Sequence, residues 1–445
     1  MKRFYLLFLI LTVFLSCSLV KPKVIPDKNL AAAVREQLGL APNEPIFEKD
    51  LRELKSLSAR RRGIKDLTGL EKAKNLQMLY LDRNKIANIT PLADLTQLKR
   101  LNLWSNEIRD IAPLTKLTEL QTLILTDNFV SDITPLTKLI KLNTLKLSGI
   151  NHKIDDITPL TALKQLTDLE LQRHQITDTT QIFSVLTGLP KLTNLTLGLN
   201  QISDIAPITR LTQLRSLLLE SNQIVDITPF TEMVQLTNLS LRNCQITDLT
   251  PIAEMPQLTE LTLVNNQISD ITAIAELTQL KKLWIVHNHI RDTTPIARLM
   301  HLESLGVSGQ RIKDIKFCSE LKQLRSLSLT NSHTSDINPL AELKHLSFLA
   351  LDHNQISDIS PLAGMAKLKE LYLSNNQISD ISPLIGLTEL TMLLLRNNQI
   401  SDISVLVNLK NLGYLNIQEN PIQNMKSIRE LRKQMPNLQI IESNR

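Results

Sequence analysis

The stretches "SNNQISDISPL" at 374–384 and "RNNQISDISVL" at 396–406 are nearly identical and lie 22 residues apart. The same phrase returns in altered form as "NNQISDITAI" at 265–274, "LNQISDIAPI" at 199–208 and "WSNEIRDIAPL" at 104–114. A fixed short period predicts an array in which each copy forms one unit and buries its apolar face against its neighbours. The period overrides chain length as a guide to domain count, because arrays grow in one direction without dividing into separate cores.

Aligned on their first leucine, the copies read L-x-x-L-x-L-x-x-N-x-I-x-D-I-x-P-L-x-x-L-x-x, and we number these positions 1 to 22. Thirteen of the fifteen complete rows between Leu76 and Leu412 hold 22 residues, whereas the rows at Leu142 and Leu166 hold 24 and 26. Positions 3 to 7 alternate with period two, which predicts a short strand with its leucines on one face. Thr-Pro or Ser-Pro at positions 15 and 16 predicts an N-cap followed by proline in a tight helical turn.

Two polar positions recur along the rows. Position 9 is Asn in most of them, and a buried amide there can bond backbone groups of successive coils. Cys244, His174, Gln310 and Ser332 replace it, and each keeps some hydrogen-bonding capacity. Position 13 is Asp in fourteen of the fifteen complete rows. A carboxylate ladder is one way to hold metal, but a side chain repeated in every row serves the row, so we expect each Asp to cap its own turn.

This is the pattern of the leucine-rich repeat, and the 22-residue form with the consensus "NQISDITPL" resembles the internalin-type surface proteins of bacteria. The segment "VIPDKNLAAAVREQLGL" is similar to the helical N-terminal cap of that family, and "LSARRRGIKDLTGLEKAKNLQMLYLDRNKI" is similar to its first coils. The resemblance spans nearly the whole mature chain. It implies an α/β repeat solenoid: a right-handed curved array with a parallel β-sheet on the concave face and short 3-10 turns on the convex face. It is specific for fold and says little about function, so binding to a host receptor does not carry over.

The expected domain organisation follows the repeat. We expect a signal peptide at 1–20, a helical N-terminal cap at 21–53, about 16–17 leucine-rich coils at 54–424 and a C-terminal cap at 425–445. In the last segment "NMKSIRELRKQMPNLQII" predicts a short helix with Met425, Ile428 and Leu431 facing inward, followed by a closing strand. The coils are irregular at 148–190, where we expect loops on the outer side; a hinge or a lip for a partner is the alternative.

Residues 1–20, "MKRFYLLFLILTVFLSCSLV", combine a charged start, an apolar run and small residues, which is typical of an export signal. "FLSC", ending at Cys17, resembles the lipobox of bacterial lipoproteins and implies a lipid on Cys17. We therefore expect a location in the cell envelope or at the cell surface. Cleavage after Ser18, giving a secreted protein, and a retained anchor are the alternatives. If Cys17 carries lipid, a basic rim that includes Arg60 and Arg83 would lie near anionic headgroups, although opposing acids favour an ordinary solvated surface.

Little in the chain points to chemistry. The net charge of +6 over 445 residues is too weak to predict nucleic-acid binding. Cys244 and Cys318 occupy different positions three rows apart, so we expect no disulfide between them. His287 and His289, with His333 and His353 in later rows, lack the Cys or Asp that would complete a metal site. We expect no cofactor, no metal and no enzymatic activity.

Aromatic side chains are placed selectively. Beyond the first twenty residues, both Trp and all three Tyr fall at positions 3, 5 or 7, whose side chains point away from the leucines. Strands favour aromatic residues in any case, but exposed rings on a rigid sheet are common anchors of protein-binding faces. The predicted partner-binding residues, with neighbouring polar side chains, are Tyr80, Arg100, Trp104, Trp284, His287, Phe348, Tyr372, Arg396 and Tyr414.

These anchors form separate clusters along the array, which favours a protein or a long polymer such as a polysaccharide over a small ligand. We predict an exported, monomeric, non-catalytic recognition scaffold that binds its partner on the concave face. Two alternatives belong to other classes. One is a passive envelope element that binds nothing in particular, and the other is a cytoplasmic regulator of an enzyme, which requires that residues 1–20 are not an export signal.

Overall fold

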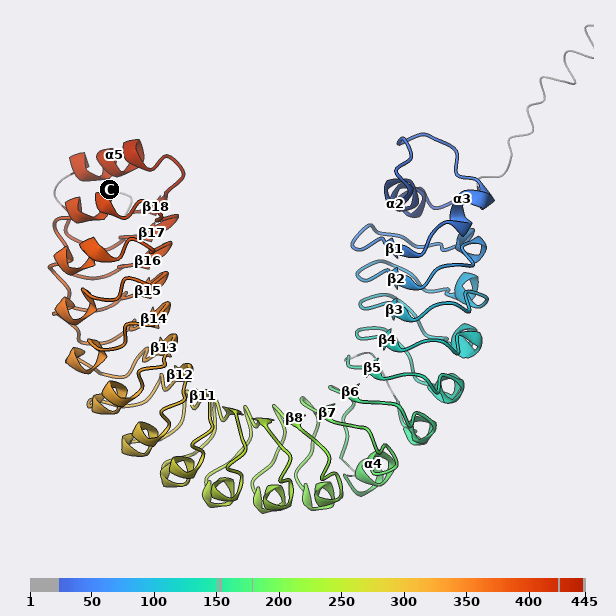
Figure 1. Cartoon of the computed structure of the whole chain (residues 1–445), viewed down its shortest axis with the longest axis horizontal. Coiled ribbons are helices and arrows are strands. Elements are labelled where there is room, and N and C mark those ends of the chain that lie inside the picture. Colours follow the sequence, from blue (N-terminus) through green and yellow to red (C-terminus); the bar gives the residue numbers. More distant parts are fainter. Residues whose placement is uncertain (1–23, 150, 152–153, 178, 423–424, 443–445) are drawn as a thin grey trace, which may run out of the picture. The chain divides into compact units, whose positions relative to one another are not determined.

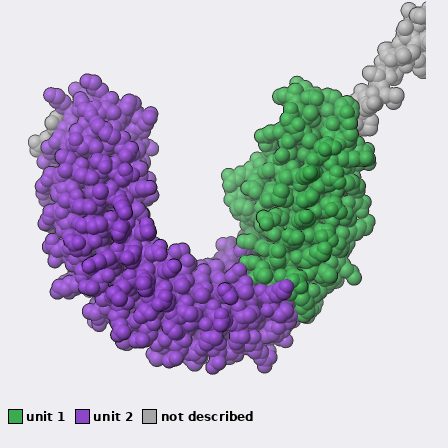
Figure 2. All heavy atoms as spheres, viewed as in Figure 1, with its two compact units in different colours: residues 1–168 green, residues 169–445 purple. Residues whose placement is uncertain are grey.

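The computed structural model describes residues 24–149, 151, 154–177, 179–422 and 425–442 (Figure 1). The predicted signal and the predicted lipidation site at Cys17 lie outside the described residues. The chain divides into two compact units, Met1–Asp168 (unit 1) and Leu169–Arg445 (unit 2), coloured separately in Figure 2. Each unit is described by itself.

Unit 1 begins with two helices and continues as a series of coils. Helix α2 (Lys28–Leu38) starts at Asp27, whose Oδ1 accepts hydrogen bonds from the backbone N–H groups of Asn29 and Leu30. Each following coil carries a three-residue strand and a 3-10 helix. The elements are α3 (Glu48–Arg52), β1 (Ser56–Ser58), η1 (Leu70–Lys72), β2 (Met78–Tyr80), η2 (Thr90–Leu92), β3 (Arg100–Asn102), η3 (Ala112–Lys116), β4 (Thr122–Ile124), η4 (Thr134–Lys138), β5 (Thr144–Lys146) and η5 (Thr158–Ala162). Strand β6 (Asp168–Glu170) lies at the boundary between the units.

Unit 2 repeats the same plan and ends in a helix and a strand. Its strands are β7 (Asn194–Thr196), β8 (Ser216–Leu218), β9 (Asn238–Ser240), β10 (Glu260–Thr262), β11 (Lys282–Trp284), β12 (Ser304–Gly306), β13 (Ser326–Ser328), β14 (Phe348–Ala350), β15 (Glu370–Tyr372), β16 (Met392–Leu394), β17 (Tyr414–Asn416) and β18 (Gln439–Ile441). Its helices are α4 (Thr179–Leu186), η6 (Ala206–Arg210), η7 (Thr228–Glu232), η8 (Thr250–Glu254), η9 (Thr272–Glu276), η10 (Thr294–Arg298), η11 (Lys316–Glu320), η12 (Asn338–Leu340), η13 (Ser360–Leu362), η14 (Ser382–Gly386), η15 (Ser404–Asn408) and α5 (Met425–Gln434).

The strands of each unit pair in parallel with the next coil, in the register that the 22-residue period dictates. Leu79 pairs with Leu101 in unit 1, and Leu371 pairs with Leu393 in unit 2. These middle leucines are almost fully buried, because position 4 points into the coil. The 3-10 helices form the opposite side of each coil, and in unit 2 the strands line the inner side of the bend (Figure 1). The predicted leucine-rich-repeat solenoid, with its parallel sheet and short 3-10 turns, is confirmed.

The asparagines of position 9 join each coil to the one before it. In unit 2 the Nδ2 of Asn376 donates to the carbonyl oxygens of Leu351 at 2.9 Å and Leu373 at 3.0 Å, while its Oδ1 accepts from the backbone N–H of Ile356 at 3.1 Å. Asn106 makes the same three bonds in unit 1. A buried amide thereby satisfies backbone groups that turn inward and could not reach water.

The aspartates of position 13 cap their own turns, as expected. In both units the Oδ1 of each described Asp accepts from the backbone N–H two residues later, for example Ala112 on Asp110 and Ser382 on Asp380, both at 2.8 Å. The Thr or Ser of position 15 is not the N-cap that its pairing with proline predicted. The cap residue is position 14, which makes no side-chain bond, and Thr250 Oγ1 instead donates to Asp248. These bonds lower the pKa of Asp248, the bond from the Thr250 hydroxyl being the largest cause.

The long row at Leu166 differs from the expected outer loop. Its additional residues form α4, a helix of eight residues that stands where the other coils have a 3-10 turn. Ile182, Phe183 and Leu186 of this helix are buried, and Phe183 is among the largest fully buried side chains of the described residues. The insertion is therefore part of the packed coil rather than a loop outside it.

Other features of unit 2 agree with the sequence. The helix α5 buries Ile428 and Leu431 ahead of the closing strand β18. Cys244 and Cys318 are buried free thiols, and burial raises the pKa of Cys244 to about 11.

In the part of the chain that the structure describes, no helix has the length and apolar character needed to cross a membrane.

Candidate functional site

The predicted partner-binding residues of unit 1 lie on the strand side of its coils. Tyr80 ends β2 and Trp104 follows β3, and both rings are half-buried, whereas Arg100 in β3 is exposed. An arginine side chain of the same protein lies over each ring. The guanidinium of Arg60 lies 4.7 Å from the centre of the Tyr80 ring, and that of Arg83 lies 4.3 Å from the Trp104 ring.

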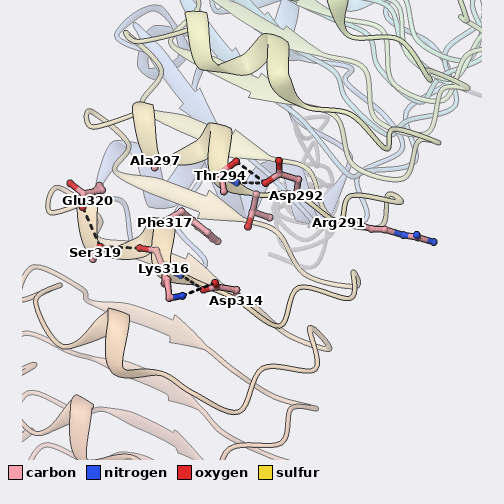
Figure 3. Close-up of a pocket in the computed structure, with 10 residues that line it drawn as sticks. Arg291, Asp292, Thr294, Ala297, Asp314, Lys316, Phe317, Ser319 and Glu320 are labelled. Carbon is pink, nitrogen blue, oxygen red and sulfur yellow. Dashed lines mark hydrogen bonds and ion pairs between the residues drawn. The ribbon is translucent and has the colours of Figure 1, made fainter.

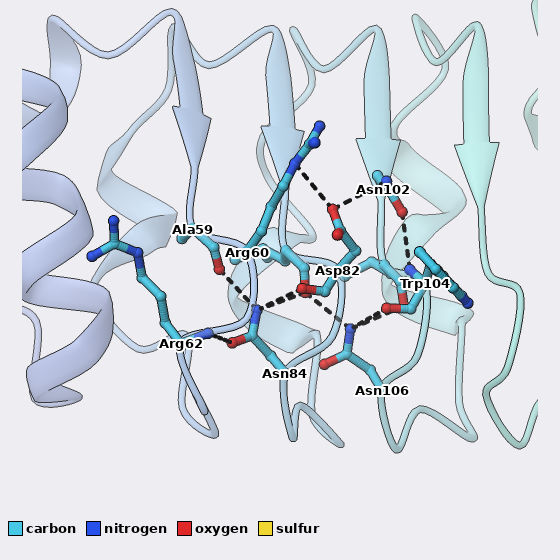
Figure 4. A network of polar contacts seen from close by, with 10 residues as sticks. Ala59, Arg60, Arg62, Asp82, Asn84, Asn102, Trp104 and Asn106 are labelled. Carbon is cyan, nitrogen blue, oxygen red and sulfur yellow. Dashed lines mark hydrogen bonds and ion pairs between the residues drawn. The ribbon is translucent and has the colours of Figure 1, made fainter. Parts of the chain in front are cut away.

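A polar network holds Arg60 in place (Figure 4). Arg60 forms an ion pair with Asp82, with Nε 3.2 Å from Oδ1, and Asn102 Nδ2 donates to the same oxygen at 3.2 Å. Asp82 is a buried carboxylate, and Trp104 Nε1 donates to Asp127 Oδ2 at 3.0 Å. Arg60 is thus engaged with a ring and an acid and Arg83 with a ring, which leaves less of the basic rim for an external anion.

In unit 2, Trp284 stands at the end of β11 and leans over the next strand. Its half-buried ring covers Gly306, since a Cβ atom added there would lie 2.2 Å from Trp284 Cε3. His287, three residues on and exposed, lies in the same way over Gly309 of the next coil, where an added Cβ would be 2.3 Å from its Nδ1. A larger residue at either glycine would occupy the space of the ring, which would then have to move.

Small side chains separate Trp284 from the next aromatic group of unit 2. Small residues at outward positions of β12 to β14 and directly after them lie between these groups, namely Ser304, Gly306, Ser308, Ser326, Ser328, Thr330 and Ala350, which we call the small-residue stretch. Because neighbouring strands lie about 4.8 Å apart, this stretch extends over roughly 14 Å. Ser308 and Ser328 hydrogen-bond to each other across it at 2.7 Å.

The far side of the small-residue stretch is bounded by a pair of rings. Phe348 of β14 and Tyr372 of β15 pack edge to face, with centroids 5.3 Å apart and planes at 77°. The Tyr372 hydroxyl donates to Glu370 Oε2 at 2.8 Å. Burial, together with this bond to Glu370, raises the pKa of Tyr372 to about 12. The phenol is therefore a neutral donor at physiological pH.

Two further predicted residues lie beyond this pair. Tyr414 in β17 is half-buried on the same side of the sheet. Arg396 forms an ion pair with Glu419, with Nη2 2.5 Å from Oε1, and both side chains are about half exposed. An exposed pair of this kind contributes little to stability, so Arg396 remains accessible to a partner.

One polar residue of this face was not predicted from the sequence. Asp352, at position 7 of the coil that holds β14, is half-buried, and its Oδ1 accepts from the backbone N–H of Ser374 at 2.9 Å. Burial raises the pKa of Asp352, although the bond from Ser374 opposes the shift. Position 7 is occupied by Ser, Thr, Gln or Val in many other rows, so the acid is a departure that a position-by-position reading could have found.

The opposite side of the coils offers only recurring hollows. One of about 640 Å³ lies between η10 and η11 and is lined by Thr294, Ala297 and Phe317 among others (Figure 3). A smaller one of about 260 Å³ occupies the same place between η8 and η9. Such hollows follow from the stacking of 3-10 turns. Among the described residues, no group of three or more His, Cys, Asp or Glu side chains is placed to hold a metal ion.

The chain matches known leucine-rich-repeat proteins. The sequence profile "Leucine Rich repeats (2 copies)" matches residues 74–116, 96–138, 118–162, 212–254, 256–298 and 344–386. No curated protein is similar in sequence.

Solved structures of bacterial proteins are similar over most of the chain. A leucine-rich-repeat protein of Leptospira interrogans is 25% identical with a TM-score of 0.60, over 88% of this chain and 97% of that one. An internalin (InlF) of Listeria monocytogenes is 30% identical with a TM-score of 0.43, over 88% of this chain and 95% of that one. The functional domain of Listeria monocytogenes InlJ, which includes a cysteine ladder, is 22% identical with a TM-score of 0.53, over 89% and 80%.

Proposed function

We propose that this chain, which belongs to the leucine-rich-repeat family and is internalin-like, is a non-catalytic scaffold that captures a protein partner on the strand face of unit 2. The observation that carries the proposal is the arrangement of Trp284 and the Phe348–Tyr372 pair on either side of the small-residue stretch. The side chains between the rings are small and weakly polar, so a partner segment can approach the strands there. It can then contact Trp284 at one end of the stretch and the Phe348–Tyr372 pair at the other. Tryptophan and tyrosine in such settings are the side chains that most often dominate binding energy.

The polar groups of this face indicate the chemistry of the partner segment. Asp352 and Glu370 are acceptors beside the rings, and burial already disfavours the charged form of Asp352. A partner that brings a cation or an N–H donor to this carboxylate would relieve part of that cost. We therefore expect a segment with an apolar side chain for the rings and a Lys, Arg or backbone donor for Asp352.

We further propose that the protein is exported and held in the cell envelope by a lipid on Cys17. The composition of residues 1–20 supports export, and the "FLSC" sequence supports lipid attachment. Cell fractionation with mass spectrometry of the mature N-terminus tests this. We expect a diacylglyceryl-modified Cys17 in the membrane fraction, and a Cys17→Ala variant released from it. An unmodified N-terminus that begins at Met1 in the cytoplasm would contradict export.

Partner capture is tested with the Trp284→Ala/Tyr372→Ala double variant. The wild-type protein, coupled to a photo-crosslinker, is expected to capture a discrete extracellular protein that the double variant does not capture. Each anchor is worth about 2 kcal/mol if it acts as a hot spot, so the affinity of the purified pair should fall at least a hundredfold. The control is Met300→Ala/Ile385→Ala, which removes two exposed apolar side chains outside the strands. Equal binding by all three proteins would refute the proposal.

A further inference from the structure

A second feature of unit 2 lies beside the strands, at positions 8, 10 and 12 of the repeat. In most neighbouring coils these positions are neutral, such as Asn265-Gln267-Ser269 and Asn375-Gln377-Ser379. In the coils that begin at Leu280, Leu302 and Leu324 they change to basic side chains. The changed residues are His287, His289 and Arg291 in the first coil, Arg311 and Lys313 in the second, and His333 in the third. Three fixed positive charges and three imidazoles are thereby concentrated in three consecutive coils.

These coils enclose a hollow of about 460 Å³, a size that suits a small molecule. It is lined by His289, Arg291, Arg311 and His333 together with amide and backbone groups, and no carboxylate is among its lining residues in the described part of the chain. Arg291 and Arg311 have no ion-pair or hydrogen-bond partner among the described side chains. Both cations line the same hollow, so an anion bound there would be attracted to each of them.

The backbone opens at the same place. Elsewhere the N–H of position 10 donates to the carbonyl of position 11 in the previous coil, as Gln267 does to Ile246 and Gln377 does to Ile356, both at 2.9 Å. Within the described residues, the N–H groups of Arg311 and His333 do not make this bond. Two backbone donors at the rim of the hollow therefore lack a protein acceptor.

Substitutions at position 9 explain the opening. Ser332 stands where Asn would bond the N–H of Ile312, and its short side chain leaves that N–H to the carbonyl of Gln310 at 3.0 Å. Gln310 itself replaces Asn and still reaches the carbonyl of Ile285 at 2.8 Å. Beside it Gly309 has a φ of 76° and lies beneath the ring of His287. The backbone bonds between coils are thus incomplete next to the basic side chains, as they are at Gln175, while the leucine core continues beneath them.

We propose that this hollow is a second binding site, separate from the strand face, for a small ligand that carries tetrahedral oxyanion groups, namely phosphate or sulfate. Planar guanidinium groups bind such oxyanions through paired N–H donors, and imidazole and backbone N–H groups add further donors. The aspartates nearest to it, Asp292 and Asp314, are occupied in capping their own turns. Both aspartates line the hollow between η10 and η11, to which Arg291 also contributes.

Titration calorimetry of the full protein in phosphate-free buffer at low salt tests the proposal, with sodium tripolyphosphate and a trisulfated disaccharide as the two probes. We expect saturable binding of at least one probe at one site. Arg291→Gln/Arg311→Gln should weaken it at least tenfold. Binding of only one probe assigns the oxyanion as phosphate or as sulfate. Binding of both probes shows that the site accepts either oxyanion. No saturable binding of either probe would overturn the proposal.

A matched variant separates a built site from general charge. Arg298→Gln/Arg325→Gln removes the same charge from the same group of coils, at exposed positions outside the hollow. The affinity of this variant for the probe should stay within twofold of the wild type. An equal loss of affinity in this variant and in Arg291→Gln/Arg311→Gln would overturn the proposal. A third protein, His289→Gln/Arg291→Ser/Arg311→Gln/His333→Gln, carries the residues that other coils have at these positions, so it should fold and not bind. Circular dichroism confirms the fold of each variant.

Discussion

The strand faces of the two units use aromatic side chains in opposite ways. In unit 1 the rings of Tyr80 and Trp104 are covered by Arg60 and Arg83, and Arg60 is held by an ion pair with Asp82. All four cation–π contacts among the described residues lie in unit 1. In unit 2, Trp284 and the Phe348–Tyr372 pair lie instead against glycine, against each other or beside small side chains.

This difference distinguishes rings that stabilise the coil from rings that are free to bind. A cation over a ring face contributes about 0.5–1 kcal/mol at an exposed site and occupies the face that a partner would contact. We therefore propose that the rings of unit 1 stabilise their coils, whereas no cation–π contact among the described residues covers the rings of unit 2. The same residue type at the same repeat position thus serves two purposes, and its neighbours in the adjacent coils decide which.

The largest effect on stability is expected at a feature that the two units share, the buried asparagines of position 9. Asn106→Ala in unit 1 and Asn376→Ala in unit 2 each leave two carbonyl groups and one N–H without a buried partner. The free energy of unfolding should fall by about 3 kcal/mol in either case, measured by urea denaturation with each unit's transition fitted separately. The exposed Gln377→Ala is the control and should change it by less than about 0.5 kcal/mol. Unequal losses at Asn106 and Asn376 would show that the units differ in their cores as well as their faces.

A smaller effect is expected from Gly306→Ser, which tests the placement of Trp284. Serine is already present at this repeat position in the next coil as Ser328, so the backbone tolerates it, but its Cβ would occupy the space of the Trp284 ring. We expect the ring to move, the partner affinity to fall about tenfold, and the stability to change by about 1 kcal/mol or less. Trp284 emission, measured in a Trp104→Phe background, reports the movement.

The control for this substitution is Gly413→Ser, where an added Cβ would meet only the Thr391 carbonyl oxygen at 3.6 Å. It should leave both the emission and the affinity unchanged. Unaltered emission from Gly306→Ser would mean that the ring does not lie over Gly306.

The smallest effect is expected in the pH dependence of stability. One carboxylate from each unit is compared, and their contributions to stability should change in opposite directions as the pH rises. Burial raises the pKa of Asp352 above 3.8, so its contribution to stability is full below about pH 3.8 and is lost as the pH rises through the folded value. Bonds from Thr134 lower the pKa of Asp132, so its contribution is full above about pH 3.8 and is lost as the pH falls through the folded value.

Urea denaturation between pH 2 and 7 measures the stability contributions of these two carboxylates. Asp352→Asn keeps an acceptor for Ser374 and should be more stable than the wild type at pH 7, with the gain shrinking in acid. Asp132→Asn should be slightly less stable at pH 7, with the loss shrinking in acid. The same sign in both variants would contradict the assigned burial of Asp352.

The spacing of the leucines was sufficient to predict the coils. The side chains at positions 4 and 6 can be buried only inside a coil that stacks on its neighbours. The role of the Asp at position 13 was predictable for the same reason, since it depends on residues of its own turn. The helix α4 was not predictable, because four additional residues fit a loop or a helix equally well until Phe183 is seen to be buried. Position 8 takes a left-handed φ in many coils, for example 57° at Asn375, and its frequent Asn was a signal that we did not use.

The candidate site was predictable only in part. Repeat positions indicated which aromatic side chains point outward, but not which cations cover them. Arg60 contacts Tyr80 from the preceding coil, whereas Trp284 meets Gly306 of the following one. Such contacts depend on the side chains of adjacent coils taken together, which a comparison of single rows does not reveal. Asp352 was missed because a row taken alone does not show that its carboxyl is partly buried and accepts from Ser374 of the next coil.

The central claim is that unit 2, and not unit 1, presents rings to a partner. It is tested most directly by measuring the dissociation constant of the captured protein for two double variants, Trp284→Ala/Tyr372→Ala and Tyr80→Ala/Trp104→Ala. The account predicts a loss of at least a hundredfold for the first and a change within twofold for the second, whose unfolding free energy alone should fall. A larger loss of affinity from the Tyr80 and Trp104 variant would contradict it.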